Sequence, residues 1–371
     1  MPPAAGSRAL RIGVDGREMM GRATGVGRYI RDVLRAWVAD PAFAHTLVIF
    51  TPSTPSPDLV AMLGPRVTWH EVPSERAGTV WEQWPLPRAV RRVGVDVFFA
   101  GAYTAPLLLR CPFVVAIHDV SYYAHPEWFR PREGLRRRWL TRESAKRAHT
   151  VITLSDFSAG EIVRHVGVAR DRIVLAPPGA PERRDVARRE VDNTVLFVGS
   201  LFTRRLIPEL IEGFAGAARH VDSARLVLVG DNRTAPLVDP RAIATELGVA
   251  DRVEWLEYVP DAELDRLYAS ARVFAFLSTY EGFAMTPLEA LSCGVAPVLL
   301  DTPVAREIYG DAALFTTAEP ASIEAALRTL LEDAPLRARL VAAGSRLRDR
   351  YVWAHTASTI RTALERAATS A

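Results

Sequence analysis

The strongest constraint on this chain is a regular alternation between short apolar runs rich in β-branched residues and longer amphipathic segments. In the first half the apolar runs are LRIGVDG, TLVIFTP, VDVFFA, CPFVVAIHD and TVITLSD. In the second half they are NTVLFVGS, RLVLVG, VEWLEY, RVFAFLS and VAPVLLD. Short buried strands that alternate with helices are typical of a parallel sheet wrapped by helices. The sequence therefore predicts an α/β fold.

The pattern is interrupted by a proline-rich break at 177–181, which a charged stretch, 182–192, follows. A chain of 371 residues is too long for one comfortable hydrophobic core, so two domains are expected. We predict an N-terminal domain over residues 1–178 and a second domain over residues 179–350. The closing stretch, 351–371, contains the amphipathic pattern WAHTASTIRTALERAAT, which predicts a helix that packs back toward the N-terminal domain.

Composition disfavours several classes of protein. Only two cysteines occur, each within an apolar run, which argues against a disulfide framework and indicates a reducing compartment. No apolar stretch approaches the roughly 20 residues of a membrane-spanning helix, and the N-terminal MPPAAGSRAL lacks the apolar region of a signal peptide. Formal net charge is only +3 and acidic residues are interspersed, so no nucleic-acid partner is expected. These features predict a soluble, cytoplasmic protein.

A glycine-containing segment, GRATGVGRY at 21–29, follows the first predicted strand and opens a helix. Glycines at such a turn let the backbone approach a phosphate closely. The dinucleotide fingerprint requires Gly or Ala where Ile30 stands, and an acidic residue at the end of the next strand, which TLVIFTP does not supply. A dehydrogenase is therefore disfavoured.

The most informative segment covers residues 278–294, where the strand VFAFLS ends in a glycine-containing loop and a helix follows. We predict Thr286 as the N-cap, Pro287 at the first helical position and Glu289 at the third. The start of a helix offers N–H groups to a diphosphate. Thr286 and Glu289 also have the spacing of a capping box, which would give Glu289 a purely structural role. Glu281 lies in the loop, where it either binds ligand hydroxyls or is simply solvated.

Two other segments place polar residues directly after predicted strands. Arg204 and Arg205 stand at the predicted start of a helix, where the helix dipole is positive. Adjacent arginines there suggest that an anion compensates them, and a solvated basic pair is the alternative. His118 and Asp119 end the strand CPFVVAI. A lone histidine in a strand is more often structural, and no His and Glu spacing for zinc accompanies it, so no metal site is expected.

The stretch YEGFAMTPLEALSCGVAPV, in which seven residues separate Glu281 from Glu289, resembles the E-x7-E signature of retaining GT-B glycosyltransferases of family GT4. LFVGSLFTRRLIPEL is similar to the family motif G-T-L-x-P-R-K-N-L, TGVGRY to its N-terminal loop, and IHD to its H-D element. Together with further segments, this resemblance covers nearly the whole chain in the expected order. It implies a GT-B fold, in which two Rossmann-like doubly wound domains face an interdomain cleft.

The resemblance also implies roles for individual residues. Glu289 would hold the ribose of a nucleotide-diphosphate sugar, and Glu281 would lie beside the sugar. The other implied donor-binding residues are Gly25, Gly27, Gly199, Arg204, Arg205, Gly282, Phe283 and Ala284. His118 would lie at the reacting sugar, and we take it as catalytic together with Arg205 and Glu281. Arg28 and Asp119 would belong to the acceptor side.

The chain departs from the family pattern at three places. Arg205 stands where the family has lysine, and Leu206 stands where it has asparagine. Arginine offers a planar fork to phosphate but is not an equivalent point charge. Ala284, Met285 and Thr286 replace Gly-Leu-Pro, which predicts an altered sugar preference.

The predicted function is that of a hexosyltransferase that uses no cofactor, and the resemblance implies that it retains the anomeric configuration. No D-x-D run occurs in the chain, which argues against the metal-dependent GT-A arrangement and predicts metal independence. GDP-mannose is the donor considered first, and the acceptor is expected to be a glycan or a lipid-linked group. The alternatives are a sugar-nucleotide-binding or structural subunit without transferase activity, and a GT-B epimerase.

Aromatic and basic residues are mixed in the stretch 128–140, WFRPREGLRRRWL, and around Trp81, Trp84 and 88–92. Such a mixture is compatible with peripheral contact with an anionic membrane, which here would be the inner face of the plasma membrane. A solvated helix anchored in the core is the alternative.

Overall fold

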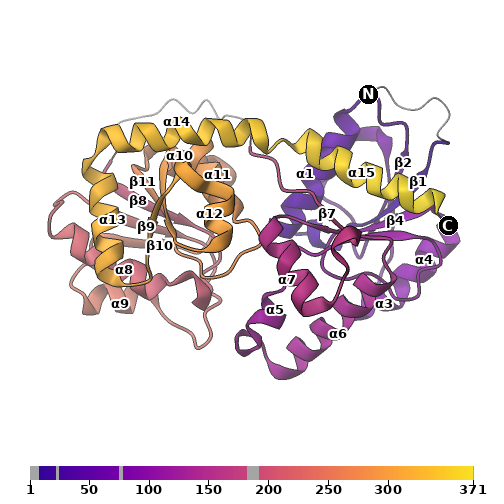
Figure 1. The fold of residues 1–371 in the computed structure, drawn as a ribbon, viewed down its shortest axis with the longest axis horizontal. Helices are drawn as coiled ribbons and strands as arrows, with labels where there is room; N and C mark the ends of the chain where they lie inside the picture. Colours follow the sequence, from indigo (N-terminus) through magenta and orange to yellow (C-terminus); the bar gives the residue numbers. More distant parts are fainter. Residues whose placement is uncertain (1–7, 22–24, 75–77, 182–191, 371) are drawn as a thin grey trace. The chain divides into compact units, whose positions relative to one another are not determined.

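The computed structural model describes residues 8–21, 25–74, 78–181 and 192–370, and it divides the chain into two compact units. Unit 1 consists of Met1–Gly179 together with Val352–Ala371, and unit 2 is Ala180–Tyr351. Each unit is built on one parallel sheet with helices packed around it (Figure 1). The α/β class predicted from the sequence is confirmed. Of the charged stretch 182–192, only Asp192 lies within the described residues.

The sheet of unit 1 has seven parallel strands in the order β3-β2-β1-β4-β5-β6-β7. The strands are β1 (Arg11–Asp15), β2 (Thr46–Thr51), β3 (Val67–Glu71), β4 (Val97–Ala100), β5 (Phe113–Ala116), β6 (Thr150–Thr153) and β7 (Ile173–Leu175). The helices around it are α1 (Gly25–Ala39), α2 (Pro57–Leu63), α3 (Thr79–Gln83), α4 (Pro85–Val93), α5 (Ser121–Ala124), α6 (Pro131–Arg147), α7 (Asp156–Val166) and α15 (Trp353–Thr369). The strand order reverses between β1 and β4, which makes this sheet doubly wound.

The sheet of unit 2 has six parallel strands in the order β10-β9-β8-β11-β12-β13. The strands are β8 (Thr194–Val198), β9 (Arg225–Val229), β10 (Val253–Leu256), β11 (Val273–Phe276), β12 (Ala296–Leu300) and β13 (Leu314–Thr316). The helices are α8 (Ile207–Ala218), α9 (Pro240–Glu246), α10 (Asp261–Ser270), α11 (Met285–Ser292), α12 (Pro303–Tyr309), α13 (Pro320–Glu332) and α14 (Ala334–Arg350). Here the order reverses between β8 and β11. All residues of both strands are buried, as expected for central strands of a covered parallel sheet.

The C-terminal helix α15 belongs to unit 1, where it packs along α1 (Figure 1). The indole Nε1 of Trp37 on α1 donates to the carbonyl oxygen of Ala357 at 2.8 Å. Arg361 pairs with Asp40 at 3.0 Å, just beyond the end of α1. Because the inner face of α15 also buries Ile360, this helix completes the core of the first unit although it comes last in the sequence.

The structure separates the aromatic residues that the sequence grouped into one membrane-facing set. Trp81 is fully buried, and its indole donates to the carbonyl oxygen of Val72 at 2.8 Å, so it belongs to the core. Trp84 and Trp139 are exposed by 54% and 57%. Of these three tryptophans, Trp84 and Trp139 are therefore available to a surface partner, whereas Trp81 is not.

A glycine allows α8 and α13 to pack closely in unit 2. A Cβ atom placed on Gly213 would lie 2.6 Å from Cγ2 of Ile323 and 3.1 Å from the carbonyl oxygen of Pro320. Gly160 on α7 is also helical, but a Cβ there would meet nothing within 4 Å. A side chain at position 213 would therefore clash with α13, whereas a side chain at position 160 would meet no neighbour.

We expect Gly213→Ala to lower the free energy of unfolding by about 1–3 kcal/mol, because overpacking outweighs the better helix propensity of alanine. The matched change Gly160→Ala should raise it by about 0.5–1 kcal/mol, since only propensity changes there. Urea unfolding of both variants measures the difference. Equal effects of the two substitutions would contradict the close α8–α13 contact.

Candidate active site

In unit 2 the strand order brings two predicted segments to one edge of the sheet. β8 and β11 are hydrogen-bonded neighbours, and Arg204 and Arg205 follow the first while Glu281 follows the second. The carboxyl ends of parallel strands at an order reversal are the usual place for a ligand. The two loops are also joined directly, because the Thr279 N–H donates to the carbonyl oxygen of Arg204 at 2.9 Å.

The centre of this site is an ion pair between Arg205 and Glu281. Nε and Nη2 of Arg205 donate to Oε1 of Glu281 at 3.1 and 3.0 Å, and Nη1 donates to the carbonyl oxygen of Ser200 at 2.8 Å. The hydroxyl of Ser278 donates to the same carboxylate oxygen at 2.9 Å, and Nε of Arg204 lies 3.8 Å from it. The anion that the sequence required beside the two arginines is thus supplied, in this structure, by Glu281.

The ion pair lies mostly out of water. The side chains of Arg205 and Glu281 are exposed by only 13% and 15%. Burial lowers the pKa of the Arg205 guanidinium, and the nearby Glu281 carboxylate opposes that shift. An arginine stays protonated even so, and its cation is further stabilised by the face of the Phe276 ring, whose centroid lies 4.9 Å from Cζ. The site therefore keeps its positive charge although water has limited access to it.

Gly199 makes room for this arginine. It follows β8 with φ at 145°, and a Cβ atom there would lie 2.5 Å from Nη1 of Arg205. Any larger residue would therefore strain the backbone and also displace the guanidinium. Gly199 is a predicted donor-binding residue, and the structure gives it a clear role in positioning Arg205.

The predicted capping box at the start of α11 is wrong. The helix begins at Met285, and Ala284 is the N-cap in the left-handed region, with φ at 65°. Thr286 is therefore the second helical residue, and its buried hydroxyl has no hydrogen-bond partner among the described residues. Glu289 instead accepts a hydrogen bond from the Tyr268 hydroxyl at 3.1 Å. Glu289 therefore does not cap the helix. Within the described chain, the N-terminal turn of α11 has no side-chain cap.

The remaining predicted donor-binding residues form the loop before α11. Gly282 and Phe283 are buried, and the Phe283 ring packs edge-on against Tyr351 at 5.0 Å between ring centroids. The carbonyl oxygen of Ala284 accepts a hydrogen bond from the hydroxyl of Tyr309. The side chain of Phe283 is thus committed to the core, so only its backbone can serve a ligand.

Gly25, Gly27 and Arg28 belong to unit 1, in the first turn of α1. Gly25 is exposed and a Cβ there would meet nothing within 4 Å, whereas Gly27 is buried and Arg28 is half-buried. Thr24, which precedes them in the glycine-containing segment, lies outside the described residues. These positions are in a different unit from Arg205 and Glu281, and their roles stay predictions.

His118 and Asp119 follow β5 in unit 1. Nε2 of His118 lies 2.8 Å from the carbonyl oxygen of Gly101, so Nε2 must carry the proton, since a carbonyl oxygen only accepts. Burial lowers the pKa of His118, while the Gly101 carbonyl and Asp119 oppose that shift, so the imidazole is neutral at neutral pH. Asp119 accepts hydrogen bonds from the Tyr103 hydroxyl at 2.9 Å and from the Ser121 N–H at 2.8 Å. The arrangement fixes both side chains after β5.

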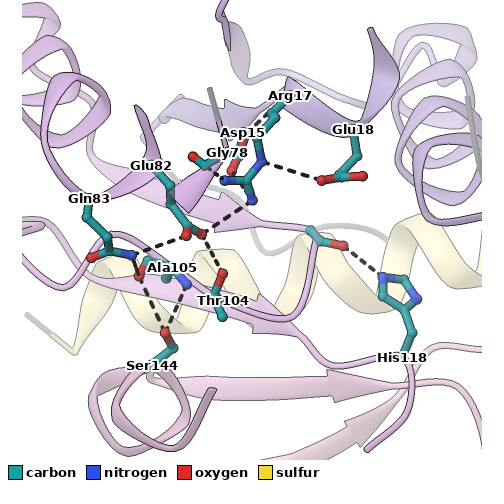
Figure 2. A network of polar contacts seen from close by, with 11 residues as sticks. Asp15, Arg17, Glu18, Gly78, Glu82, Gln83, Thr104, Ala105, His118 and Ser144 are labelled. Carbon is teal, nitrogen blue, oxygen red and sulfur yellow. Dashed lines mark hydrogen bonds and ion pairs between the residues drawn. The ribbon is translucent and has the colours of Figure 1, made fainter. Parts of the chain in front are cut away.

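Sequence reasoning missed a buried polar network beside these residues (Figure 2). Arg17 lies between Asp15, 3.5 Å away, and Glu82, 3.4 Å away. Oε1 of Glu82 also accepts a hydrogen bond from the Thr104 hydroxyl at 2.6 Å. Burial raises the pKa of Glu82, and the nearby Arg17 opposes the shift. Asp15 ends the first predicted strand, so the rule that singled out His118 and Asp119 would also have found it, but nothing local pointed to Glu82.

Two further observations concern the described part of the chain only. It holds no helix that combines the length and the apolarity needed to cross a bilayer. It also contains no group of three or more His, Cys, Asp or Glu side chains arranged to hold a metal ion.

Solved structures with a similar fold include the Anabaena protein HepE in complex with UDP and glucose. The TM-score is 0.74 at 19% identity, over 96% of this chain and 99% of that one. The predicted GT-B fold is thereby confirmed. Residues 180–347 match the model of Glycosyl transferases group 1, and residues 23–184 match that of Glycosyltransferase Family 4. The chain belongs to the family 4 glycosyltransferases of group 1.

Curated relatives are similar over part of their length. The O-antigen chain mannosyltransferase B of Escherichia coli is 29% identical over 59% of this chain and 60% of that protein. The GDP-mannose:cellobiosyl-diphosphopolyprenol alpha-mannosyltransferase of Komagataeibacter xylinus is 28% identical over 62% of this chain and 61% of that protein. The matched regions thus span about three fifths of these relatives.

The contact between Gly199 and Arg205 predicts that Gly199→Ala lowers the free energy of unfolding by about 2–4 kcal/mol, because backbone strain and the displaced ion pair add. Gly248→Ala is the matched control, since Gly248 also has a positive φ, 71°, but open space around its Cα. We expect the control to cost about 1–2 kcal/mol, from the left-handed backbone alone. Chemical denaturation distinguishes the two, and equal losses would contradict the contact.

Proposed function

We propose that this protein transfers a hexose, in the first instance mannose, from GDP-mannose to a hydroxyl group of a glycan or lipid-linked acceptor, with retention of anomeric configuration. The observation that carries the proposal is the convergence of Arg204, Arg205 and Glu281 at the strand-order reversal of unit 2. The names of both curated relatives, which specify mannosyl transfer, support the choice of sugar.

In the proposed reaction unit 2 holds the donor. The diphosphate lies against Arg204, Arg205 and the first N–H groups of α11, and the carboxylate of Glu289 binds the ribose hydroxyls. A diphosphate bound there shares the guanidinium groups with Glu281, which weakens their hold on that carboxylate and lets it accept a hydrogen bond from the sugar.

Negative charge grows on the departing diphosphate as the glycosidic bond breaks. The two arginines are already fixed by their contacts, so they stabilise that charge without reorganising. We propose that fixed guanidinium groups take the part that a metal ion plays elsewhere, and that neither metal nor cofactor is required. His118 and Asp119 in unit 1 are proposed to receive the acceptor hydroxyl.

The alternative is a subunit that binds the sugar nucleotide without transferring it. The same arginines and carboxylates would serve such a protein, so binding alone does not distinguish the two. Hydrolysis of the donor does, because an active glycosyltransferase releases some sugar to water. A GT-B epimerase would convert the donor sugar without any acceptor, which product analysis detects.

We expect GDP to raise the melting temperature by about 5 °C or more at saturating concentration, and UDP and ADP to have smaller effects, because a ligand bound only by the folded protein stabilises it. Glu281→Gln should lower donor turnover about 100-fold or more. GDP should stabilise this variant at least as strongly as the wild type, because the arginines lose a competing anion. Thermal shift and donor hydrolysis, each with and without EDTA, measure these effects.

The control variant is Glu332→Gln, an exposed acid beyond the site at the end of α13, which should change neither quantity. Unaltered turnover in Glu281→Gln would remove the assigned role of that carboxylate. The absence of any shift with nucleotide diphosphates would overturn the proposal as a whole.

We further propose that α6 of unit 1 contacts an anionic membrane surface. Leu135 and Trp139 are exposed by 64% and 57%, and they lie on the same face of α6 as Arg142 and Lys146. Among the described residues Arg132, Arg136 and Arg142 form no ion pair, whereas the acids of α6 are paired, Glu133 with Arg137 and Glu143 with Arg147. An apolar stripe flanked by uncompensated cations fits the boundary of an anionic bilayer.

Replacing both Leu135 and Trp139 by alanine should lower binding to anionic vesicles about tenfold or more, because both side chains lose apolar burial. Leu237→Ala is the matched control, since Leu237 is a 77% exposed leucine in unit 2. Co-sedimentation with phosphatidylglycerol and phosphatidylcholine vesicles measures the effect. Equal binding of the wild type to both vesicle types would contradict the proposed preference for an anionic surface, and binding to neither would dismiss the membrane contact.

A further inference from the structure

The loop that follows β4, residues 101–105, contains a strained residue at the carboxyl edge of the unit 1 sheet. Tyr103 has φ at 65°, in the left-handed region that side chains other than glycine rarely adopt. Such a conformation costs on the order of 1–3 kcal/mol and persists only where the surroundings enforce it. We call residues 101–105 the β4 loop.

The strain is held by hydrogen bonds on both sides of Tyr103. Its own N–H donates to the carbonyl oxygen of Ala116, the last residue of β5, at 2.7 Å. The next residue, Thr104, donates its hydroxyl to the buried carboxylate of Glu82 at 2.6 Å. Glu82 is itself paired with Arg17, so the far end of this network reaches the residues that follow β1.

The end of the β4 loop is fixed as firmly as its middle (Figure 2). The Ala105 N–H donates to the hydroxyl of Ser144 on α6 at 2.9 Å, and the Ala105 carbonyl accepts from Gln83 at 3.1 Å. At the start of the loop, the Gly101 carbonyl accepts from His118. The backbone of the loop is therefore held by hydrogen bonds to α3, β5 and α6. These contacts restrict the conformational freedom of Tyr103.

Tyr103 contacts His118 and Asp119, the two residues proposed to receive the acceptor hydroxyl. Its ring centroid lies 5.4 Å from that of His118, and its hydroxyl donates to Oδ2 of Asp119 at 2.9 Å. The other tyrosine that flanks His118 is Tyr29. Its side chain is only 1% exposed, and its hydroxyl donates a hydrogen bond to the Ala176 carbonyl oxygen. Tyr103 is only half-buried, so part of its ring remains accessible at the sheet edge.

We propose that Tyr103 is a further acceptor-binding residue: its ring packs against the apolar face of a pyranose, and its hydroxyl orients Asp119 to accept a hydrogen bond from the acceptor hydroxyl. An aromatic ring offers a large, rigid apolar surface, and its hydroxyl adds a directional contact. Glu82 touches no substrate and acts as a positioning residue through Thr104. This inference rests on the proposed function and names the acceptor group that the same reaction takes, a single hexopyranose ring.

The test compares transfer to methyl hexopyranosides with hydrolysis of GDP-mannose in the same full-length protein. Tyr103→Ala should lower the ratio of transfer to hydrolysis on the order of 30-fold, as expected for loss of an aromatic contact residue. Tyr103→Phe should lower it about tenfold, because Asp119 loses a hydrogen bond to a charged acceptor. Tyr123→Phe is the control, since Tyr123 is half-buried in the same unit but bonds the Arg138 carbonyl instead, and it should leave the ratio unchanged.

Thr104 tests the positioning role of Glu82 without altering Tyr103. Thr104→Val removes the hydroxyl that Glu82 accepts from, and it should raise the KM for the methyl hexoside about tenfold while donor hydrolysis and the GDP-induced thermal shift stay at wild-type levels. Thr104→Ser keeps the hydroxyl and should restore the wild-type KM. A merely structural role would instead lower stability and hydrolysis together.

An unchanged ratio in Tyr103→Ala overturns the inference, as does a wild-type protein that hydrolyses the donor but transfers to no methyl hexoside. Both outcomes leave the proposed donor chemistry standing, because hydrolysis and nucleotide binding are measured separately. Loss of nucleotide binding and of hydrolysis in the wild type would overturn the proposed function and this inference with it.

Discussion

Parallel sheets that are covered on both faces leave only the ends of their strands for chemistry. In each unit the central strands are buried along their length, so a charged side chain within them would lie out of water. The polar residues follow the strands instead. Asp15 ends β1 and His118 comes shortly after β5 in unit 1, while Arg205 and Glu281 follow β8 and β11 in unit 2. One constraint of packing thus decides, in each unit, where the candidate site residues lie.

The described chain has three non-glycine residues with positive φ, namely Tyr103, Leu206 and Ala284, and each adjoins a candidate site residue. Leu206 follows Arg205 and caps α8, and Ala284 caps α11. In the family pattern these last two positions hold asparagine and glycine, which adopt the left-handed region at lower cost. This chain therefore carries strain of about 1–2 kcal/mol at each. The hydrogen bond from the Tyr309 hydroxyl to the Ala284 carbonyl helps to hold the second.

Local patterns in the sequence were sufficient to predict the central strands and α15, because a buried strand and an amphipathic helix each produce a recognisable pattern over consecutive residues. The edge strands β3, β7 and β13 were not predicted, since β3 is only partly buried and lacks a continuous apolar run, and β7 and β13 have three residues each. The start of α11 was placed too late because nothing in the sequence indicates that Ala284 adopts the left-handed conformation.

Long-range partners were the other limit of the sequence. The charge of Arg205 indicated an anion, but nothing local showed that Glu281, 76 residues away, supplies it in this structure. The network of Arg17 and Glu82 is a pairing of the same kind, 65 residues apart. Such contacts depend on the order of strands in a sheet, which the alternation of apolar and amphipathic segments does not specify.

The arginine at position 205 follows from the burial of the site. A lysine in the same place would lose its proton more readily as water is excluded, whereas a guanidinium remains charged. The guanidinium also has five N–H groups, and its contacts to Glu281 and Ser200 engage only one on each nitrogen. The second N–H groups of Nη1 and Nη2 remain for another acceptor. Arg205 can therefore keep its place between Ser200 and Glu281 and still present a fork to a diphosphate, which a three-donor ammonium could do only by giving up one of those contacts.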